Sequence, residues 1–268
     1  MPEVSIIVTI TRHWALEKLF YCLDNLITPT ETEVILYIDT DDDKVINSVS
    51  QYVDNCKFNV NTIISGNSSP NEIRIKDRRD RISNNHNDLK KYINGEYVLE
   101  FEDDTVFPED SLVRLLKIIK REDVGFVQGV QVGRWGYRMI GVWKVNNISN
   151  PTKIITYPFT KIDKVGDYVE GIDAGGFYCY MTKASLFKEH EFTWHDECFG
   201  PDVSYGLSLK NKGFKNYVIW NLLCGHNIGN AILYPDDKVV QIEYNKINDR
   251  WILKPKTLTK QSKCCRST

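Results

Sequence analysis

Three consecutive carboxylates, Glu102, Asp103 and Asp104, follow a largely apolar run over residues 97–101 that starts after Gly95. The β-branched and aromatic side chains of this run favour a buried strand, which we predict to end at Asp104. In an open α/β sheet, ligands bind just outside the carboxyl ends of the strands. Three adjacent carboxylates repel one another unless a cation lies between them, and a hard divalent ion with oxygen ligands is the simplest such cation. The other interpretation is a solvated acidic turn.

The first part of the chain supplies the elements that must position this acidic strand end. Residues 4–10, 33–38 and 58–64 are predicted strands, and residues 14–26 and 45–53 between them carry apolar side chains at helical spacing. Strands that alternate with helices form βαβ units around a parallel sheet. We therefore expect an α/β fold with a mostly parallel central sheet and helices on both faces.

The second part of the chain has a less regular pattern, with more aromatic, Asn and Gly residues. The expected elements are a basic segment over 73–92 that is helical by its end, a helix over 111–120, a strand over 124–132, strand pairs and loops over 134–160, a glycine-hinged strand over 171–181, a helix from an N-cap at Thr182 through Phe187, a helix over 202–212 stopped by Gly213, and a strand over 217–223.

Composition excludes several classes of protein. The 268 residues are 42% hydrophobic and 26% charged, as in an ordinary globular protein. The formal net charge of -2 argues against a general nucleic-acid binder, which would be clearly basic. No apolar run approaches the roughly 20 residues of a membrane span, and the N-terminus lacks the basic and apolar regions of a signal peptide. We therefore expect a cytoplasmic protein whose seven cysteines are reduced thiols.

Taken in order, the motifs between about Val4 and about His226 resemble those of a GT-A glycosyltransferase of the family 2 type. In the first half of the chain, residues 5–12 lie where the family has Pro-Thr-Tyr-Asn, Asp39 ends the second strand, and His86-Asn87 lies where the family often has Arg-Asn. Glu102-Asp103-Asp104 then takes the place of Asp-X-Asp. In the second half, residues 196–202 lie where a segment normally ends in Glu-Asp, and Gly213-Phe214 and His226 complete the series. The sequence departs from the family pattern at Ile10, Thr11, His86 and Pro201.

The resemblance implies a metal-dependent transferase of the hexosyltransferase type. It would move a sugar from a nucleotide-sugar donor, a UDP-sugar, to an acceptor hydroxyl with inversion. A bound Mn²⁺ or Mg²⁺ stabilises negative charge on the leaving diphosphate. Asp104 and His226 are the implied metal ligands, and an imidazole suits Mn²⁺ better than Mg²⁺. The implied nucleotide-sugar contacts are Thr9, Thr11, Arg12, Asp39, Arg81, Asn87, Glu102 and Asp103, with Asp39 accepting a hydrogen bond from uracil N3–H.

The same resemblance divides the domain into a nucleotide-sugar-binding half, 1–132, and an acceptor-binding half, 133–250, followed by a polar basic tail, 251–268. Asp202 is the implied general base, because a carboxylate within hydrogen-bond reach can take the proton of an acceptor hydroxyl. Trp194, Asp196 and Glu197 are expected to contact the acceptor, which would be a glycan, a lipid-linked sugar or a protein.

Each of these residues also has an ordinary structural interpretation. Asp202 could be a helix N-cap, Asp39 part of an Asp-rich turn, His226 a structural histidine, and the basic cluster 74–81 a solvated helix face. At the level of the whole chain, a nucleotidyltransferase can share the sheet and the acidic strand end. That class usually has a glycine-rich phosphate loop after the first strand, which residues 9–12 lack.

The third alternative is a non-catalytic, sugar-binding descendant of the fold. The joint presence of Asp104, Asp202 and His226 argues against it.

Overall fold

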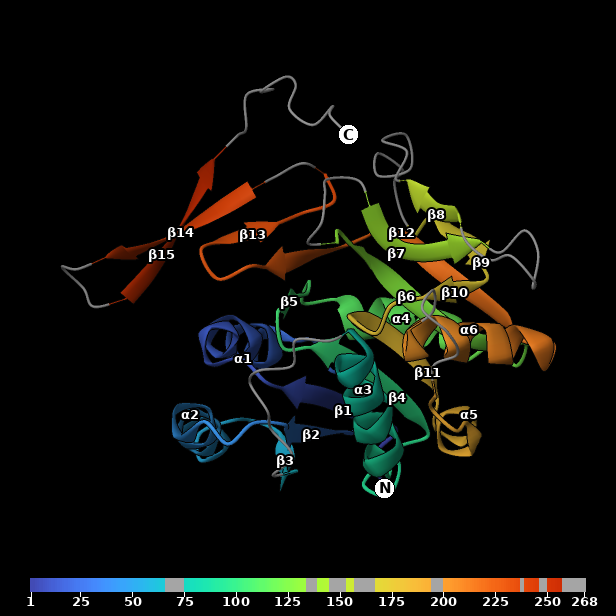
Figure 1. The fold of residues 1–268 in the computed structure, drawn as a ribbon, viewed down its shortest axis with the longest axis horizontal. Coiled ribbons are helices and arrows are strands. Elements are labelled where there is room, and N and C mark those ends of the chain that lie inside the picture. The colour runs from blue at the N-terminus through green and yellow to red at the C-terminus, as the bar shows by residue number, and fades with distance from the viewer. Residues whose placement is uncertain are drawn as a thin grey trace.

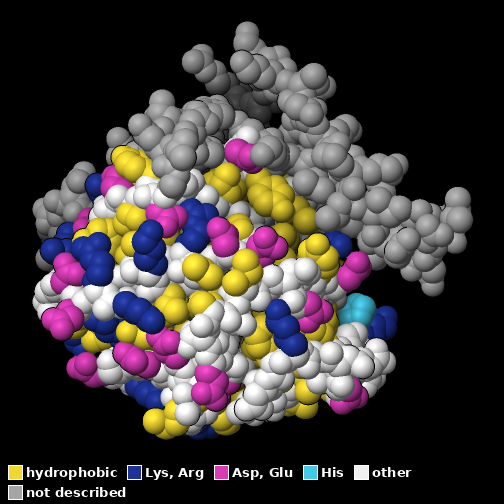
Figure 2. Space-filling view, turned by 180° about the vertical axis from the view of Figure 1, so that it is seen from behind, with side chains coloured by type: hydrophobic (Ala, Val, Ile, Leu, Met, Phe, Trp, Pro, Cys, Tyr) yellow, Lys and Arg dark blue, Asp and Glu magenta, His cyan; other side chains and the backbone are white. Residues whose placement is uncertain are grey.

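The computed structural model describes the chain except for residues 66–74, 134–138, 145–152, 157–166, 194–199, 237–238, 246–249 and 257–268. Its main feature is a large central sheet with helices packed on both faces (Figure 1). Among the described residues no helix combines the length and the apolar character needed to cross a membrane. Basic and acidic side chains are interspersed over the described part of one molecular face (Figure 2), so that face carries no single-sign patch.

The parallel part of the sheet is built from the four predicted N-terminal strands. These are β1 (Val4–Ile10), β2 (Thr32–Ile38), β3 (Asn59–Ile64) and β4 (Tyr97–Glu102), paired in the order β4-β1-β2-β3. Each pair is parallel and in continuous register, with Thr9 opposite both Tyr37 and Glu102. The carboxyl ends of β1, β2 and β4 therefore meet at one edge of the sheet.

Alternate side chains of these strands point to opposite faces of the sheet and pack into two separate apolar cores. Ile6 and Val8 lie in the core that also holds side chains of three helices, whereas Ile7 lies in the other core. The first core is covered by α1 (Leu16–Asn25), α2 (Asp43–Val53) and α4 (Ser111–Ile119), and the second by α3 (Ile75–Leu89), α5 (Ala184–Glu189) and α6 (Pro201–Asn211). Burial on both faces explains why the strands are continuous apolar runs.

The second half of the chain extends the sheet on the far side of β4. Strand β11 (Cys179–Lys183) inserts antiparallel between β4 and β6 (Val124–Gln131), and β6 then pairs in parallel with β12 (Lys215–Asn227). The remaining strands are β5 (Thr105–Val106), β7 (Met139–Lys144), β8 (Lys153–Thr156), β9 (Val169–Ile172), β10 (Ala174–Gly175), β13 (Ala231–Leu233), β14 (Val239–Asn245) and β15 (Arg250–Lys256).

The long strand β12 brings the predicted site residue His226 to the end of β4, where residues 102–104 lie. We call this edge of the sheet the acidic edge. Its last residues pair antiparallel with β5, which places His226 opposite Thr105. Asn227 N–H also donates to the carbonyl of Asp104, at 2.8 Å. His226 and Thr105, more than a hundred positions apart in the sequence, thus become neighbours at the end of β4.

The structure corrects several details of the predicted elements. Strand β4 ends at Glu102, and the remaining acidic residues form the turn into β5. A 3₁₀ turn, η1 (His13–Ala15), precedes α1. The N-cap prediction for Thr182 is wrong: the residue lies inside β11, and its hydroxyl makes buried hydrogen bonds to the Gly125 carbonyl and Tyr205 Oη. The region where we expected the tail begins with β15, paired with β14.

Candidate active site

A cavity of about 100 Å³ opens where the carboxyl ends of β1, β2 and β4 meet. Residues from α3 and from the turn after β10 complete its wall, among them Asn85, His86 and Phe177. Seven of the eight predicted nucleotide-sugar contacts line it, namely Thr9, Thr11, Arg12, Asp39, Arg81, Glu102 and Asp103. The structure therefore gathers residues that lie far apart in the sequence into one pocket, which we call the donor pocket after these predicted contacts.

Asp103 and Arg12 tie the turn after β1 to the acidic end of β4. Buried Asp103 accepts hydrogen bonds from the backbone N–H groups of Thr11 and Arg12, at 2.8 and 3.0 Å, and from the Thr11 hydroxyl at 3.1 Å. The guanidinium of Arg12 contacts Asp103 as well and lies 3.0 Å from Asp104 Oδ2. Although burial alone would lower the pKa of Arg12, the neighbouring carboxylates raise it. In this structure the cation among the acidic residues is a guanidinium.

Asp39 is held rigidly in the pocket wall at the end of β2. Its buried carboxylate accepts hydrogen bonds from Ser65 Oγ at 2.8 Å and Asn85 Nδ2 at 2.7 Å, and pairs with Arg81 Nε at 3.0 Å. Sequence reasoning missed Asn85, although it lies four residues after Arg81 and so on the same helix face. Asp39 is 1% exposed and so is not part of a solvated Asp-rich turn. Asp42 is the residue that caps α2, by accepting a hydrogen bond from the backbone N–H of Lys44.

Asn87 does not line the donor pocket. Its side chain donates to the carbonyl of Phe192 at 2.9 Å and accepts from the Phe192 N–H at 3.0 Å. One residue further along a helix turns a side chain by about 100°, so Asn87 faces away from the site that its neighbour His86 reaches. The structure gives Asn87 a role in anchoring the segment after α5.

His86 and Glu100 form a buried pair in the wall of the donor pocket that sequence reasoning did not find. His86 Nε2 lies 2.9 and 3.1 Å from the two Glu100 oxygens, and Nδ1 lies 2.7 Å from the carbonyl of Ile82. Both ring nitrogens face acceptors, an arrangement that favours the doubly protonated ring. Burial alone would lower the pKa of His86, but Glu100 raises it above the ordinary value, and Asp202 adds to this effect. Phe177 stacks on the ring, with centroids 4.4 Å apart.

Asp202 lies in the first turn of α6, close to this pair. The helix begins with Gly200 at the N-cap and Pro201 after it, so the N-cap interpretation of Asp202 is wrong. Burial raises the pKa of Asp202 to about 6. Phe177 lines the donor pocket and also lies beside Asp202, in a gap that has no room for a water molecule. The predicted acceptor contacts Trp194, Asp196 and Glu197 lie outside the described residues.

Asp104 and His226, the two predicted metal ligands, meet at the end of β4. Asp104 is 1% exposed, and its Oδ2 lies 3.4 Å from His226 Nε2. His226 Nδ1 lies 2.8 Å from the carbonyl of Val132, an arrangement that makes Nδ1 the N–H donor. In the neutral ring the Nε2 lone pair then points toward the carboxylate, which is the orientation of a metal-ligating histidine.

Comparison with known proteins places the chain in a family. Residues 2–232 match the family described as Glycosyltransferase like family 2. The chain belongs to this glycosyltransferase family. No curated protein sequence matches the chain significantly.

Solved structures share the GT-A fold of this glycosyltransferase chain. Mannosyltransferase PcManGT from Pyrobaculum calidifontis, in complex with GDP-Man and Mn²⁺, matches with a TM-score of 0.59 at 14% identity, over 83% of this chain and 56% of its own. S. aureus TarS 1-349 in complex with UDP has a TM-score of 0.53 at 15% identity, over 81% and 57% of the two chains. A197 from STIV has a TM-score of 0.50 at 11% identity, over 89% and 93%. The chain thus spans little more than half of the first two structures.

The residues of the acidic edge fit a divalent cation of the kind that the mannosyltransferase structure contains. A carboxylate and an imidazole suit Mn²⁺, and a carboxylate with water suits Mg²⁺. Within the described residues there is no group of three or more His, Cys, Asp or Glu side chains that could hold a metal. Asp104 and His226 are the two described residues that would hold such an ion.

Proposed function

We propose that this chain is a metal-dependent, inverting glycosyltransferase of the hexosyltransferase type. It would transfer a sugar from a UDP-sugar to an acceptor hydroxyl. The observation that carries this proposal is the donor pocket, in which Asp39, Arg12 and Asp103 from three strand ends converge next to Asp104 and His226. A nucleotidyltransferase gains no support from the structure, because the turn after β1 contains no glycine and is held instead by Asp103.

The nucleotide base would bind against Asp39. Three donors fix the orientation of this carboxylate, so little conformational freedom is lost when it accepts another hydrogen bond. Uracil offers N3–H as the donor. Guanine offers N1–H and its amino group, and GDP-Man is the ligand named for the mannosyltransferase structure. Uracil is the base that we propose, and the relative affinities for UDP and GDP distinguish it from guanine.

The diphosphate would lie beside Arg12 at the acidic end of β4. A divalent ion held by Asp104 and His226 would supply electrostatic stabilisation of the leaving diphosphate. Arg12 reaches the same place from the other side, with its side chain 31% exposed and already in contact with both aspartates. Its guanidinium can form paired hydrogen bonds to phosphate oxygens, which would orient the diphosphate against the strand ends.

Asp202 would act as the base on the acceptor side. With its pKa raised to about 6, the carboxylate is largely ionised at neutral pH and a better proton acceptor than an ordinary aspartate. Inversion requires this proton to be taken on the sugar face opposite the leaving group. The imidazolium of His86 favours the ionised form of Asp202 without making a salt bridge to it, because His86 is bound to Glu100.

The test is release of nucleoside diphosphate from UDP-Glc, UDP-GlcNAc and GDP-Man, each measured with Mn²⁺ and with excess EDTA. We expect release from a UDP-sugar in Mn²⁺ only, loss of activity in Asp104→Ala, and near-normal activity in Asp43→Ala, which removes an exposed carboxylate of α2. NMR of the product would give the anomeric configuration. Full activity in EDTA would refute metal dependence, and no release from any donor would refute the proposed function.

A further inference from the structure

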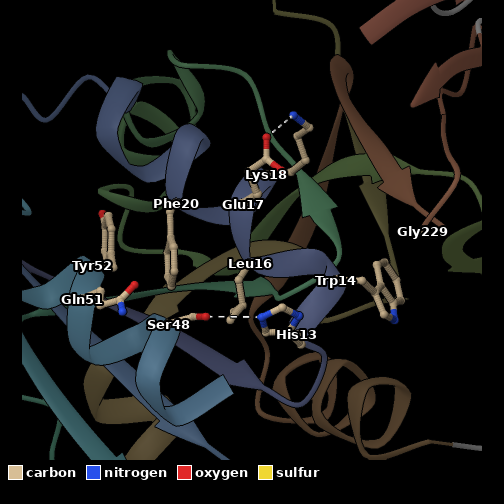
Figure 3. Close-up of a pocket in the computed structure, with 10 residues that line it drawn as sticks. All are labelled: His13, Trp14, Leu16, Glu17, Lys18, Phe20, Ser48, Gln51, Tyr52 and Gly229. Atoms are coloured by element: carbon tan, nitrogen blue, oxygen red, sulfur yellow. Dashed lines mark hydrogen bonds and ion pairs between the residues drawn. The ribbon is translucent and has the colours of Figure 1, made fainter. Parts of the chain in front are cut away.

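A second cavity, of about 560 Å³, lies between α1 and α2 and is distinct from the donor pocket. Figure 3 shows how its lining residues are arranged. The parallel rings of Phe20 and Tyr52 are stacked at one end, with centroids 4.0 Å apart, and Trp14 lies at the other end beside Gly229. His13 and Ser48 lie between the two ends, joined by a hydrogen-bond contact of 3.3 Å. We call this cavity the helix groove.

The helix groove and the acidic edge share two connections of the chain. His13 and Trp14 directly follow Arg12, which contacts Asp103 and Asp104. Gly229 lies three residues after His226 and adopts a φ of +94°, which a residue with a side chain rarely takes. The end of the groove that holds Trp14 is therefore built from the same two segments that bring Arg12 and His226 to the acidic edge.

The chemistry of the groove matches that of a sugar chain. A sugar ring has apolar C–H faces and a rim of hydroxyl groups that both donate and accept hydrogen bonds. Trp14 is 45% exposed, so the groove offers aromatic surface to such a face, and this indole also carries an N–H donor. Ser48 and Gln51 add side chains that donate as well as accept. The volume is within the range of about 300–1,000 Å³ that is usual for small-molecule sites.

Charge argues against a nucleotide or a phosphate in this groove. Among the described residues that line it, the only Lys or Arg is Lys18, and its ammonium lies 3.3 Å from the Glu17 carboxylate. A phosphate site would need several cations or a cluster of exposed backbone N–H groups. Aromatic surface at both ends, with polar side chains between them, suits a ligand of more than one sugar ring.

We propose that the helix groove binds an oligosaccharide portion of the acceptor, with one sugar on Trp14 and another toward the Phe20–Tyr52 end. This inference rests on the proposed function, because a glycosyltransferase acts on an acceptor and the Trp14 end of the groove shares two chain segments with the acidic edge. It names the acceptor as a glycan of at least two units, and it makes Trp14 a binding residue remote from the bond that forms.

The test uses direct binding, so that it does not depend on turnover. Chitotetraose, mannotetraose and maltotetraose are each titrated into the wild-type chain, Trp14→Ala, Gln51→Ala and Tyr21→Ala, with detection by ligand-observed NMR. Tyr21 is the matched control because it is an aromatic residue of α1, is 64% exposed and does not line the groove. We expect at least one tetrasaccharide to bind, about tenfold weaker in Trp14→Ala, weaker in Gln51→Ala, and unchanged in Tyr21→Ala.

Two outcomes would overturn the proposal: binding of none of the three sugars, or equal binding by wild type and Trp14→Ala. Thermal unfolding of each variant shows whether it is folded, and Gln51→Ala probes the groove independently if Trp14→Ala is not. UDP binding in Mn²⁺ is measured on the same samples and should be equal in all four. Absence of UDP binding in wild type would count against the proposed function. Normal UDP binding together with equal sugar binding by wild type and Trp14→Ala would count against sugar binding in the helix groove alone.

Discussion

Arg12 Nη1 lies 3.0 Å from Asp104 Oδ2, so a side chain of the first βα turn neutralises the residue that we propose as a metal ligand. The sequence indicated that a cation must accompany the acidic strand end. The structure shows that the protein carries one already. A divalent ion that binds Asp104 must therefore share this carboxylate with Arg12 or displace it, and Arg12 would then be available to the donor diphosphate.

This arrangement predicts a linkage between Arg12 and metal affinity. Arg12→Ala leaves two buried, adjacent aspartates without their guanidinium, and we expect it to destabilise the metal-free protein by roughly 2 kcal/mol. Because the competing cation is gone, Mn²⁺ should raise the melting temperature of Arg12→Ala more than that of wild type. Thermal unfolding with and without Mn²⁺ measures both effects, with Arg12→Lys as the charge-conserving control. Equal Mn²⁺ stabilisation of Arg12→Ala and wild type would show that Arg12 and the metal do not compete.

A second prediction concerns the base that Asp39 recognises. Calorimetry with UDP, CDP and GDP in Mn²⁺ should rank UDP first, because uracil presents an N–H where cytosine presents a bare nitrogen. Asp39→Asn keeps the shape of the side chain but introduces an N–H group, and it should weaken UDP binding by about 10-fold or more while affecting CDP less. Equal affinity of wild type for the three nucleotides would remove Asp39 from base recognition. GDP in first place would keep its role and change the donor.

Much of this geometry could be expected from the sequence, because the parallel strands are apolar runs and parallel strands place their ends at one edge. Asp39 and Asp104 follow such runs, so their convergence was predictable. The contacts within the site were not. Glu100 is a single charged residue within an apolar run that still reads as a strand. No feature of the neighbouring sequence indicates that His86 is its partner. Pairs of this kind are fixed by the packing of α3 on the sheet.

The extent of β12 shows a second limit of sequence reasoning. We expected a strand over 217–223, followed by residues 224–227. In the structure the strand continues to Asn227, because β5 and β13 supply backbone partners for these residues. Tertiary pairing here overrides the local preference of the residues. His226 was found through its place in the family series and not through its secondary structure.

The His86–Glu100 pair predicts a pH-dependent stability. Because Glu100 raises the pKa of His86, the pair stabilises the fold fully below the ordinary histidine pKa near 6.5, and this contribution is lost as pH rises through the higher folded value. Glu100 from β4 and Asp202 from α6 both favour the charged ring. Urea unfolding between pH 6 and pH 9 should therefore show falling stability in wild type.

Two substitutions of His86 separate charge from packing. His86→Gln should lose roughly 3 kcal/mol at pH 6, because Glu100 stays buried without its cation, and should flatten the pH dependence. His86→Arg, the residue that the family often has here, keeps the charge at all these pH values and should flatten the dependence with a smaller loss. An unchanged pH profile in both variants would show that the buried ring is neutral.

The last prediction concerns Asp202 and uses the same substitution to separate catalysis from structure. Asp202→Asn keeps the size of the side chain but cannot take a proton, so the transfer rate should fall by roughly 10²–10⁴-fold while UDP binding stays nearly unchanged. In wild type the rate should fall as pH decreases through about 6, the pKa to which burial raises Asp202. Because Gly200 and not Asp202 caps α6, loss of a cap cannot account for such an effect.

Stability supplies the independent readout for Asp202. A carboxyl group whose folded pKa lies above its unfolded value disfavours the folded state increasingly as pH rises from about 4 through 6. Asp202→Asn removes this penalty. It weakens the hydrogen bonds that the carboxylate accepts from the backbone N–H groups of Asp202 and Val203, and it loses the attraction of a carboxylate to the helix N-terminus, about 0.3–1 kcal/mol. At pH 7 the variant should therefore be about as stable as wild type. A slow but stable enzyme would support Asp202 as the base. A transfer rate within a few-fold of wild type would exclude Asp202 and direct the search to Asp196 and Glu197.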